Sequence, residues 1–285
     1  MTSMRDIKQR IENVRSTEQI IRAMDMVAST KLQKARRQLE GVRPIYKELK
    51  RTVEEVGNRE EAKTHHFYQE RKVKNSLYIV LTSDRGLSGS YNTNISAHAL
   101  KHMNAGKNEK LLVVGSKGNE YFKKRHKNII RKITDILDAR IYYGTESLGK
   151  WLSDLYLSGE VDEVFIAYTR FDNVLSYVPQ VERLLPIASG VEHEEVSHSD
   201  EKKYEPDIDT FIDHAIPLYL HMSLFRAFSE AHTSENAARM INMDAAGKNA
   251  SDLIKDLTSM YNRKRQAAIT QELSEIVGSA NFLSK

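Results

Sequence analysis

The segment TSDRGLSGSYN, from Thr82 to Asn92, has the residue types of a loop that could bind a phosphate group. It follows the apolar run SLYIVL and precedes an apparent helix, NISAHALKHM. A strand, a glycine-rich turn and a helix N-terminus are the parts of a phosphate-binding loop, because backbone N–H groups then point at the anion. The first question is whether this segment binds a nucleotide.

The spacing of the segment argues against a nucleotide site. It lacks the G-x-x-x-x-G-K-[ST] pattern of a P-loop and the G-x-G-x-x-G pattern of a dinucleotide fold. It also has no lysine to bind β- and γ-phosphates. We expect Gly86 and Gly89 to allow a sharp turn between strand and helix. No cofactor site and no catalytic residue are predicted.

Metal and thiol chemistry find little support in the sequence. The chain has no cysteine, which excludes disulfides, thiolate ligands and cysteine nucleophiles. His65 and His66 are adjacent, but no further ligands lie near them in the sequence. We interpret them as surface residues, and no metal site is predicted.

Charged residues are unevenly distributed. The net charge is +4, with basic clusters at 31–37 (KLQKARR) and 263–265 (RKR) and an acidic stretch at 191–209. Solvated helix faces would explain such clusters. Attraction to an acidic partner, whether nucleic acid, a membrane surface or acidic protein loops, is the alternative.

Residues 1–57 have the period of a coiled-coil helix. Apolar or small residues recur at steps of three and four, the heptad signature of one helix packed along another. Successive steps of four at Met24, Ala28 and Leu32 resemble a stutter, and Gly41 and Pro44 predict an interruption with a bend. The predicted seam is Met4, Ile7, Ile11, Val14, Thr17, Ile21, Met24, Ala28, Leu32, Ala35, Leu39, Val42, Tyr46, Leu49, Val53 and Val56.

Residues 76–206 have the pattern of an α/β domain. The runs SLYIVL, KLLVVG, KNIIRKI and EVFIAYT predict strands, with helices expected around 92–105, 117–126 and 145–158. This βαβ alternation predicts a Rossmann-like, mostly parallel sheet. The neighbouring runs VFIAYTRFDN and YVPQVERLLPI predict one antiparallel edge. Residues 58–75 are polar and aperiodic, which predicts a linker or exposed loop.

Residues 207–285 return to the helical period, with an expected kink at Pro217. One long helix enters the α/β domain and the other leaves it, so they should pair antiparallel, and the alanine-rich 234–254 should allow close approach. The longer second helix should project beyond the pair from about Arg263. The predicted stripe is Ile208, Phe211, Ala215, Leu218, Met222, Phe225, Leu253, Leu257, Met260, Ile269, Leu273 and Ile276. The predicted fold class is α/β: a long antiparallel coiled coil of N- and C-terminal helices with an inserted Rossmann-like α/β domain.

Four segments in collinear order resemble the γ subunit of F-type (F1Fo) ATP synthases, bacterial type. YNRKRQAAITQELSEIVGSA is similar to the C-terminal signature of that family, and IRAMDMVASTKLQKAR to its N-terminal helix motif. TSDRGLSGSYNTNI resembles its strand-to-helix turn and SENAARMINMDAAGKNASDLI its shaft segment. The chain departs from the family at Ser88-Gly89-Ser90 and Gly278-Ser279, and it lacks the cysteine-bearing insertion of chloroplast relatives.

The resemblance implies a rotor shaft without catalytic residues of its own. Such a chain turns inside a ring of three α and three β subunits. Its α/β domain lies with the ε subunit on the membrane c-ring, and it couples ion-driven rotation to ATP synthesis or hydrolysis. Met24 is then expected to contact the ring, although it also fits as a plain seam residue. The other expected contacts to the ring are Arg239, Arg265, Gln266, Thr270 and Glu272.

Two other classes of function were weighed against the rotor. A basic, helical nucleic-acid-binding protein is allowed by the pI near 9, but such proteins usually show aromatic or motif features beside the charge. A Rossmann-type enzyme is disfavoured by the missing phosphate motifs. The start lacks the apolar region of a secretory signal, and no apolar run approaches the roughly 20 residues of a membrane span. The expected location is peripheral, at the cytoplasmic face of the bacterial membrane.

Overall fold

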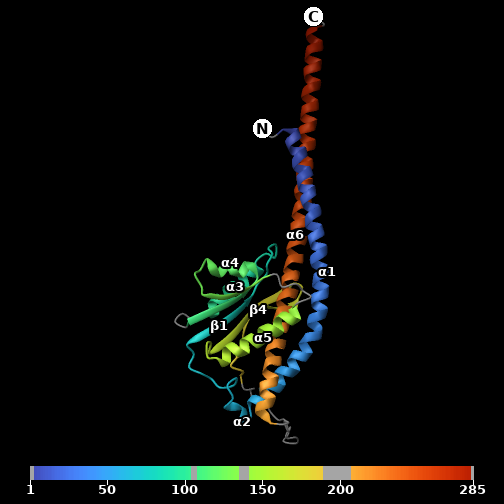
Figure 1. Ribbon diagram of the computed structural model, residues 1–285. Coiled ribbons are helices and arrows are strands. Elements are labelled where there is room, and N and C mark those ends of the chain that lie inside the picture. Colours follow the sequence, from blue (N-terminus) through green and yellow to red (C-terminus); the bar gives the residue numbers. More distant parts are fainter. Residues whose placement is uncertain (1–2, 104–107, 135–140, 189–206, 284–285) are drawn as a thin grey trace. The chain divides into compact units, whose positions relative to one another are not determined.

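The computed structural model describes residues 3–103, 108–134, 141–188 and 207–283, with side chains as far as residue 277 (Figure 1). These residues form two units, Met1–Ser29 with Arg239–Lys285, and Thr30–Ala238. We call the first the two-helix unit and the second the α/β unit. The long helices α1 (Met4–Gly57) and α6 (Ile208–Leu283) contribute to both units. The expected division at residues 57, 75 and 206 stays a prediction.

The sheet of the α/β unit is mostly parallel with one antiparallel edge, as the sequence predicted. Its order is β3-β2-β1-β4-β5, with β1 (Asn75–Leu81), β2 (Asn108–Val114), β3 (Ile129–Ile133) and β4 (Glu163–Asn173) parallel. β5 (Ser176–Leu185) pairs antiparallel with β4 and forms one edge. The mixed Rossmann-like sheet is therefore confirmed.

Helices cover both faces of this sheet, as the alternation along β1 requires. Leu77, Ile79 and Leu81 face a core that includes side chains of α5 (Ile141–Leu157) and of the long helices. Tyr78 and Val80 face a second core with α3 (Tyr91–His102) and α4 (Ser116–Lys123). The central strands are apolar on both faces because both faces are buried.

The segment at 58–75 contributes side chains to the core of the α/β unit, which corrects the expectation of an exposed loop. It contains the short helix α2 (Glu60–Lys63), and the side chains of Ala62, Phe67 and Tyr68 are buried in the first core. Tyr68 Oη donates a hydrogen bond to the carbonyl of Val53 at 2.7 Å. Most residues around Ala62, Phe67 and Tyr68 are polar, so the segment shows no hydrophobic period that would have predicted their burial.

Neither long helix is interrupted at its proline. α1 continues through Gly41 and Pro44, and α6 continues through Pro217. The predicted interruption of α1 is therefore wrong. In α1 the neighbours of the proline are held by the core, with Val42 buried and Tyr46 packed against it. Tertiary packing offsets the lost backbone hydrogen bond of a proline inside a helix.

The buried seam of α1 differs in register from the predicted one between Val14 and Ala28. Glu18 and Asp25 are half-buried, whereas Thr17 and Met24 are exposed. With Glu18 and Asp25 included, the steps of three and four alternate from Ile7 to Val56 without a break, so the expected stutter is absent. The pattern search followed apolar residues, but helix geometry decides which positions face the partner.

The two-helix unit is an antiparallel pair. Ile7 and Ile11 form a buried cluster with Leu257, against which Tyr261 also packs. Further along, a Cβ added at Gly247 would lie 3.7 Å from Ile21 Cγ2. The antiparallel pairing and the close approach at small residues are both as predicted. Leu253 and Met260, which were assigned to the stripe, are exposed instead, as is Leu218 in the α/β unit.

Candidate functional site

The polar groups of the turn after β1 are used inside the fold. Ser83 N–H donates to Asn92 Oδ1 at 2.9 Å. Asp84 Oδ1 accepts from both the N–H and the hydroxyl of Ser116, at 2.9 and 3.0 Å. The Asp84 carboxylate therefore binds the N-terminus of α4, so this charged group of the turn is already used within the fold.

Of the two glycines expected to allow the sharp turn, the structure supports this role for Gly89 and not for Gly86. Gly89 has φ of 57°, in the left-handed region, but the other residue with positive φ in the turn is Leu87. Gly86 has open space around it and no positive φ. The close approach occurs instead at Gly115 (φ 92°), where a Cβ would overlap the carbonyl oxygen of Thr82.

Helix α6 occupies the place where dinucleotide folds bind their ligand. In open α/β sheets this is the crevice at the carboxyl ends of the strands, where the strand order reverses, here between β1 and β4. The hydroxyl of Tyr91, which begins α3, donates to the carbonyl of Ala231 in α6 at 3.0 Å. Glu230 of α6 accepts from the N–H of Phe171 in β4 at 2.7 Å. A nucleotide in this crevice would have to displace α6.

Other surfaces of the described residues suggest no chemical centre. No group of three or more His, Asp or Glu side chains in the described ranges could hold a metal ion. His65 lies 3.4 Å from Asp213, as an ion pair would if the imidazole were protonated. A shallow hollow of about 600 Å³ in the α/β unit is lined mainly by cations, including Lys123, Lys127 and Arg131.

Exposed apolar side chains gather on α1 of the two-helix unit. Met24 is 40% exposed, and Ile20, Met26 and Val27 beside it are more exposed still. Ile20, Met24 and Val27 lie at i, i+4 and i+7, on one helix face. We call Ile20, Met24 and Val27 the apolar patch; Met26 is exposed on another side of the helix. A contiguous exposed apolar patch indicates a contact surface for another protein, so Met24 is not a plain seam residue.

The end of α6 forms a second exposed surface, which we call the tip (residues 269–277). All side chains of the tip are exposed, and Ile269, Leu273 and Ile276 again lie on one helix face. Before the tip, Lys264 and Ala268 are still half-buried. The projecting tip is confirmed as far as residue 277, although it begins a few residues later than predicted. Phe282 lies outside the described side chains.

Helix α1 begins with a cap formed by Ser3 and Asp6. Ser3 N–H donates to Asp6 Oδ2 at 2.9 Å, and Asp6 N–H donates to Ser3 Oγ at 3.1 Å, a reciprocal N-cap. Hydrogen bonds to the Asp6 carboxyl from the backbone and the side chain of Ser3 lower its pKa, and the charge of Lys264 lowers it further. The first turn of α1 thus lies close enough to Lys264 for the charge of that lysine to favour the ionised form of Asp6.

The polar candidate residues all lie in the two-helix unit but do not form one cluster. Arg265, Gln266, Thr270 and Glu272 are exposed along α6. The hydroxyl of Thr270 donates to the carbonyl of Gln266 at 2.9 Å, so it already has an acceptor within the helix. Arg239, at the start of the unit, is half-buried.

The two-helix unit exposes further apolar contact candidates that the motif comparison missed, namely Ile20, Met26, Val27 and Val277. The signal was present in the sequence, because IRAMDMVA has more apolar residues than one seam can bury. Fold and surfaces together define a class of protein: an assembly subunit, in which an antiparallel helix pair with exposed apolar side chains continues into an α/β unit.

Comparison with known proteins assigns the family. The model of the ATP synthase family matches residues 3–283. The ATP synthase γ chain of Alkaliphilus metalliredigens is 38% identical over 284 residues, which cover 98% of each chain. The chain therefore belongs to the γ chains of ATP synthase, and the resemblance seen in its motifs is confirmed. Its function is that of a central-stalk rotor subunit of an F-type ATP synthase.

Solved structures show the same fold. A chain of the Euglena gracilis mitochondrial ATP synthase, from an assembly of OSCP, F1 and c-ring, has a TM-score of 0.68 and 20% identity, with coverage of 98% of this chain and 94% of that one. A chain of the central stalk and c-ring of the Tetrahymena thermophila enzyme has a TM-score of 0.62 and 24% identity, covering 80% and 99%. In the described residues, no helix combines the length and apolar character needed to cross a membrane.

Proposed function

We propose that the two-helix unit turns inside a ring of α and β subunits and transmits torque to their catalytic sites through the apolar patch and the polar residues beside it. The α/β unit would then bind the ε subunit and the membrane c-ring. Met24 would contact the ring through the apolar patch. The polar contacts would come from Arg239, Arg265, Gln266, Thr270 and Glu272.

The observation that carries this proposal is the exposure of apolar side chains on a helix pair that has almost no core of its own. Met26 is 71% exposed and Ile276 is 63% exposed. Leaving such side chains in water is unfavourable by roughly 1.5–3 kcal/mol each relative to full burial. A ring of partner subunits around the pair would cover them, and apolar surfaces without directional bonds would still permit sliding.

An asymmetric pair of helices can also place the three catalytic subunits of the ring in different conformational states. Each catalytic subunit would face a different side of the pair, and a contact that differs between subunits shifts the conformational equilibrium of each by its differential free energy. The basic side chains of the pair, such as Arg265, would face acidic loops of the ring.

The proposal includes a non-catalytic role and a peripheral location. Catalysis would belong to other subunits of the complex, because α6 fills the crevice that a nucleotide would need. The chain would be held at the cytoplasmic face of the bacterial membrane through the c-ring. Ion transport would occur in the membrane part, and neither a cofactor nor nucleic acid would be required.

Assembly from purified subunits tests this proposal. Mixed with α and β subunits, the chain should form a complex with one copy per three of each, measured by native mass spectrometry. Leu273→Asp should weaken that complex, whereas Leu175→Asp, at an exposed turn of the α/β unit, should not. A chain that forms no such complex would disprove the proposed role.

Nucleotide binding by the chain alone is a separate test. Calorimetry with Mg-ATP should show no binding in the micromolar range, because α6 occupies the crevice and the turn lacks a phosphate-binding lysine. Micromolar, Mg-dependent binding by the isolated chain would contradict the non-catalytic role.

A further inference from the structure

The second half of β4 has a strand neighbour on one side only. Strand β1 pairs with β4 as far as Val80 and Ala167, whereas β4 continues to Asn173 alongside β5. Backbone groups of β4 beyond Ala167 therefore need partners on the side that β1 has left.

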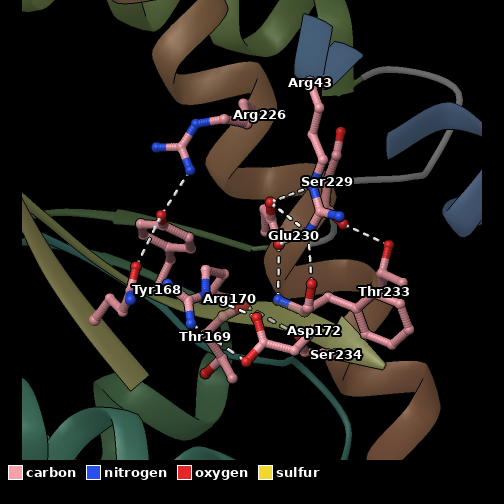
Figure 2. Close-up of polar contacts among 12 residues, drawn as sticks. Arg43, Tyr168, Thr169, Arg170, Asp172, Arg226, Ser229, Glu230, Thr233 and Ser234 are labelled. Atoms are coloured by element: carbon pink, nitrogen blue, oxygen red, sulfur yellow. Dashed lines mark hydrogen bonds and ion pairs between the residues drawn. The ribbon is translucent and has the colours of Figure 1, made fainter. Parts of the chain in front are cut away.

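Side chains of the two long helices provide these partners (Figure 2). The N–H of Phe171 donates to Glu230 Oε2 at 2.7 Å, and the carbonyl of Phe171 accepts from Arg43 Nη2 at 2.5 Å. One step back on the same edge, the carbonyl of Thr169 accepts from Ser234 Oγ at 3.0 Å. Side chains of α6 and α1 thus take the place of the missing strand.

Two ion pairs reinforce these bonds. Glu230, which is 2% exposed, accepts from Arg43 Nε and Nη2, both at 2.9 Å. Arg226, one turn earlier on α6, donates to Tyr168 Oη at 2.6 Å (Figure 2). It also donates to Glu182 Oε2 at 2.5 Å. Burial raises the pKa of the Tyr168 hydroxyl, so it remains protonated. We call Arg43, Arg226, Glu230 and Ser234, with their bonds to the β4–β5 hairpin, the edge clamp.

The edge clamp differs physically from the apolar packing around it. Apolar contacts are non-directional, so they resist a small rotation of α6 about its axis only weakly. Hydrogen bonds weaken steeply when their angle changes, and separating a buried ion pair leaves an uncompensated charge. Arg226, Glu230 and Ser234 lie at i, i+4 and i+8, so they hold one face of α6 along the β4–β5 hairpin over two turns.

We propose that the edge clamp sets the torsional stiffness of the joint between the sheet and the long helices. The inference rests on the proposed function, in which torque passes between the α/β unit and the helix pair. Its members are positioning residues that act by holding α6 at one angle to the sheet, and they touch no substrate.

The experiment measures angular fluctuations in an assembled complex. The chain has no cysteine, so Lys123→Cys at the exposed end of α4 gives a unique site for a bead on the α/β unit. The complex with α and β subunits is fixed to a surface through β and stalled without nucleotide. Glu230→Gln and, at a more exposed position, Arg43→Gln are each compared with the unchanged chain. Leu111→Ala, in the core on the other face of the sheet, is the control for loss of stability.

Each clamp variant should raise the variance of the bead angle about twofold, since one of the two ion pairs that hold α6 to the β4–β5 hairpin is lost. Leu111→Ala should lower the melting temperature without changing that variance. Equal variance in all four proteins, or an equal rise in the control, would overturn the proposal. If the unchanged chain forms no complex, the proposed function fails instead. The edge clamp can then be tested in the free chain with spin labels at Lys123→Cys and His214→Cys. The width of the distance distribution between the labels measures how far α6 moves relative to the sheet, and Glu230→Gln should broaden it.

Discussion

The α/β unit buries large apolar side chains on both faces of its sheet, whereas the two-helix unit exposes many apolar residues. In its described part the buried apolar residues are few: Ile7, Ile11, Ala28, Met243 and Leu257. Polar side chains follow the same contrast. In the α/β unit Glu230 and Arg226 are buried and paired. In the two-helix unit the ion pairs, such as Lys248 with Asp244, are exposed and local.

This difference separates intrinsic stability from the capacity to bind. The α/β unit contains the interactions that stabilise a fold without partners. A two-stranded helix pair with a narrow seam is only marginally stable in water, so much of its apolar surface can contribute free energy only when another protein covers it. Loss of stability in the free chain and loss of coupling in the complex should therefore map to different units.

The largest effect should be a core truncation. Leu77→Ala, at a fully buried position of β1, should lower the free energy of unfolding by about 2–5 kcal/mol. The matched change Leu273→Ala at the tip should alter it by less than about 0.5 kcal/mol. Urea denaturation of the free chain, followed by circular dichroism, measures both. Similar losses in the free energy of unfolding at the two positions would contradict the proposed difference between the two units.

A charge in the apolar patch should affect the complex rather than the fold. Met24→Lys should reduce ATP-driven ion pumping of the assembled enzyme by about tenfold, which corresponds to about 1.4 kcal/mol, because a cation pressed against partner loops resists desolvation. Assembly and the unfolding of the free chain should change little. Leu175→Lys, at an exposed turn of the α/β unit, is the control. Pumping like that of the unchanged enzyme would show that Met24 makes no coupling contact.

Glycine replacements should have opposite signs in the two units. Gly247→Ala should raise the free energy of unfolding of the helix pair by roughly 0.5–1 kcal/mol, since alanine favours helix and the new Cβ meets Ile21 at an ordinary distance. Gly115→Ala should destabilise the α/β unit, because the residue has positive φ and its Cβ would overlap Thr82. Thermal unfolding of both variants shows whether the melting temperature rises for Gly247→Ala and falls for Gly115→Ala.

The smallest effect should come from removing residues 280–285. The melting temperature of the free chain should remain nearly unchanged, and assembly should weaken only in part. Hydrogen exchange gives the sharper measurement. Amides from Ile269 to Ile276 should exchange with little protection in the free chain and become protected in the complex. Strong protection in the isolated chain would mean that the tip has a partner within the chain.

Sequence patterns predicted the helices and strands well, but they predicted less well which residues of the long helices are buried and which are exposed. All five strands, the antiparallel edge, the two long helices and the exposed tip follow from period and motif. Met24 was found by motif and Ile20 and Val27 were not, although all three lie in one patch. The buried Phe67 and Tyr68 were missed because polar neighbours mask them. The roles of the polar candidates at the ring remain predictions.

The amino-acid sequence by itself determined the type of each element, because strand and helix periods are local properties of the backbone. It also determined the family, through motifs spread along the chain. The tertiary structure alone decided that Asp25 and not Met24 lies in the seam, and that Pro44 stays within a helix. It alone placed Arg43 and Glu230 on the unpaired edge of β4. Each of these depends on a partner far away in the sequence, and a local pattern carries no information about which distant group will satisfy a buried charge or backbone atom.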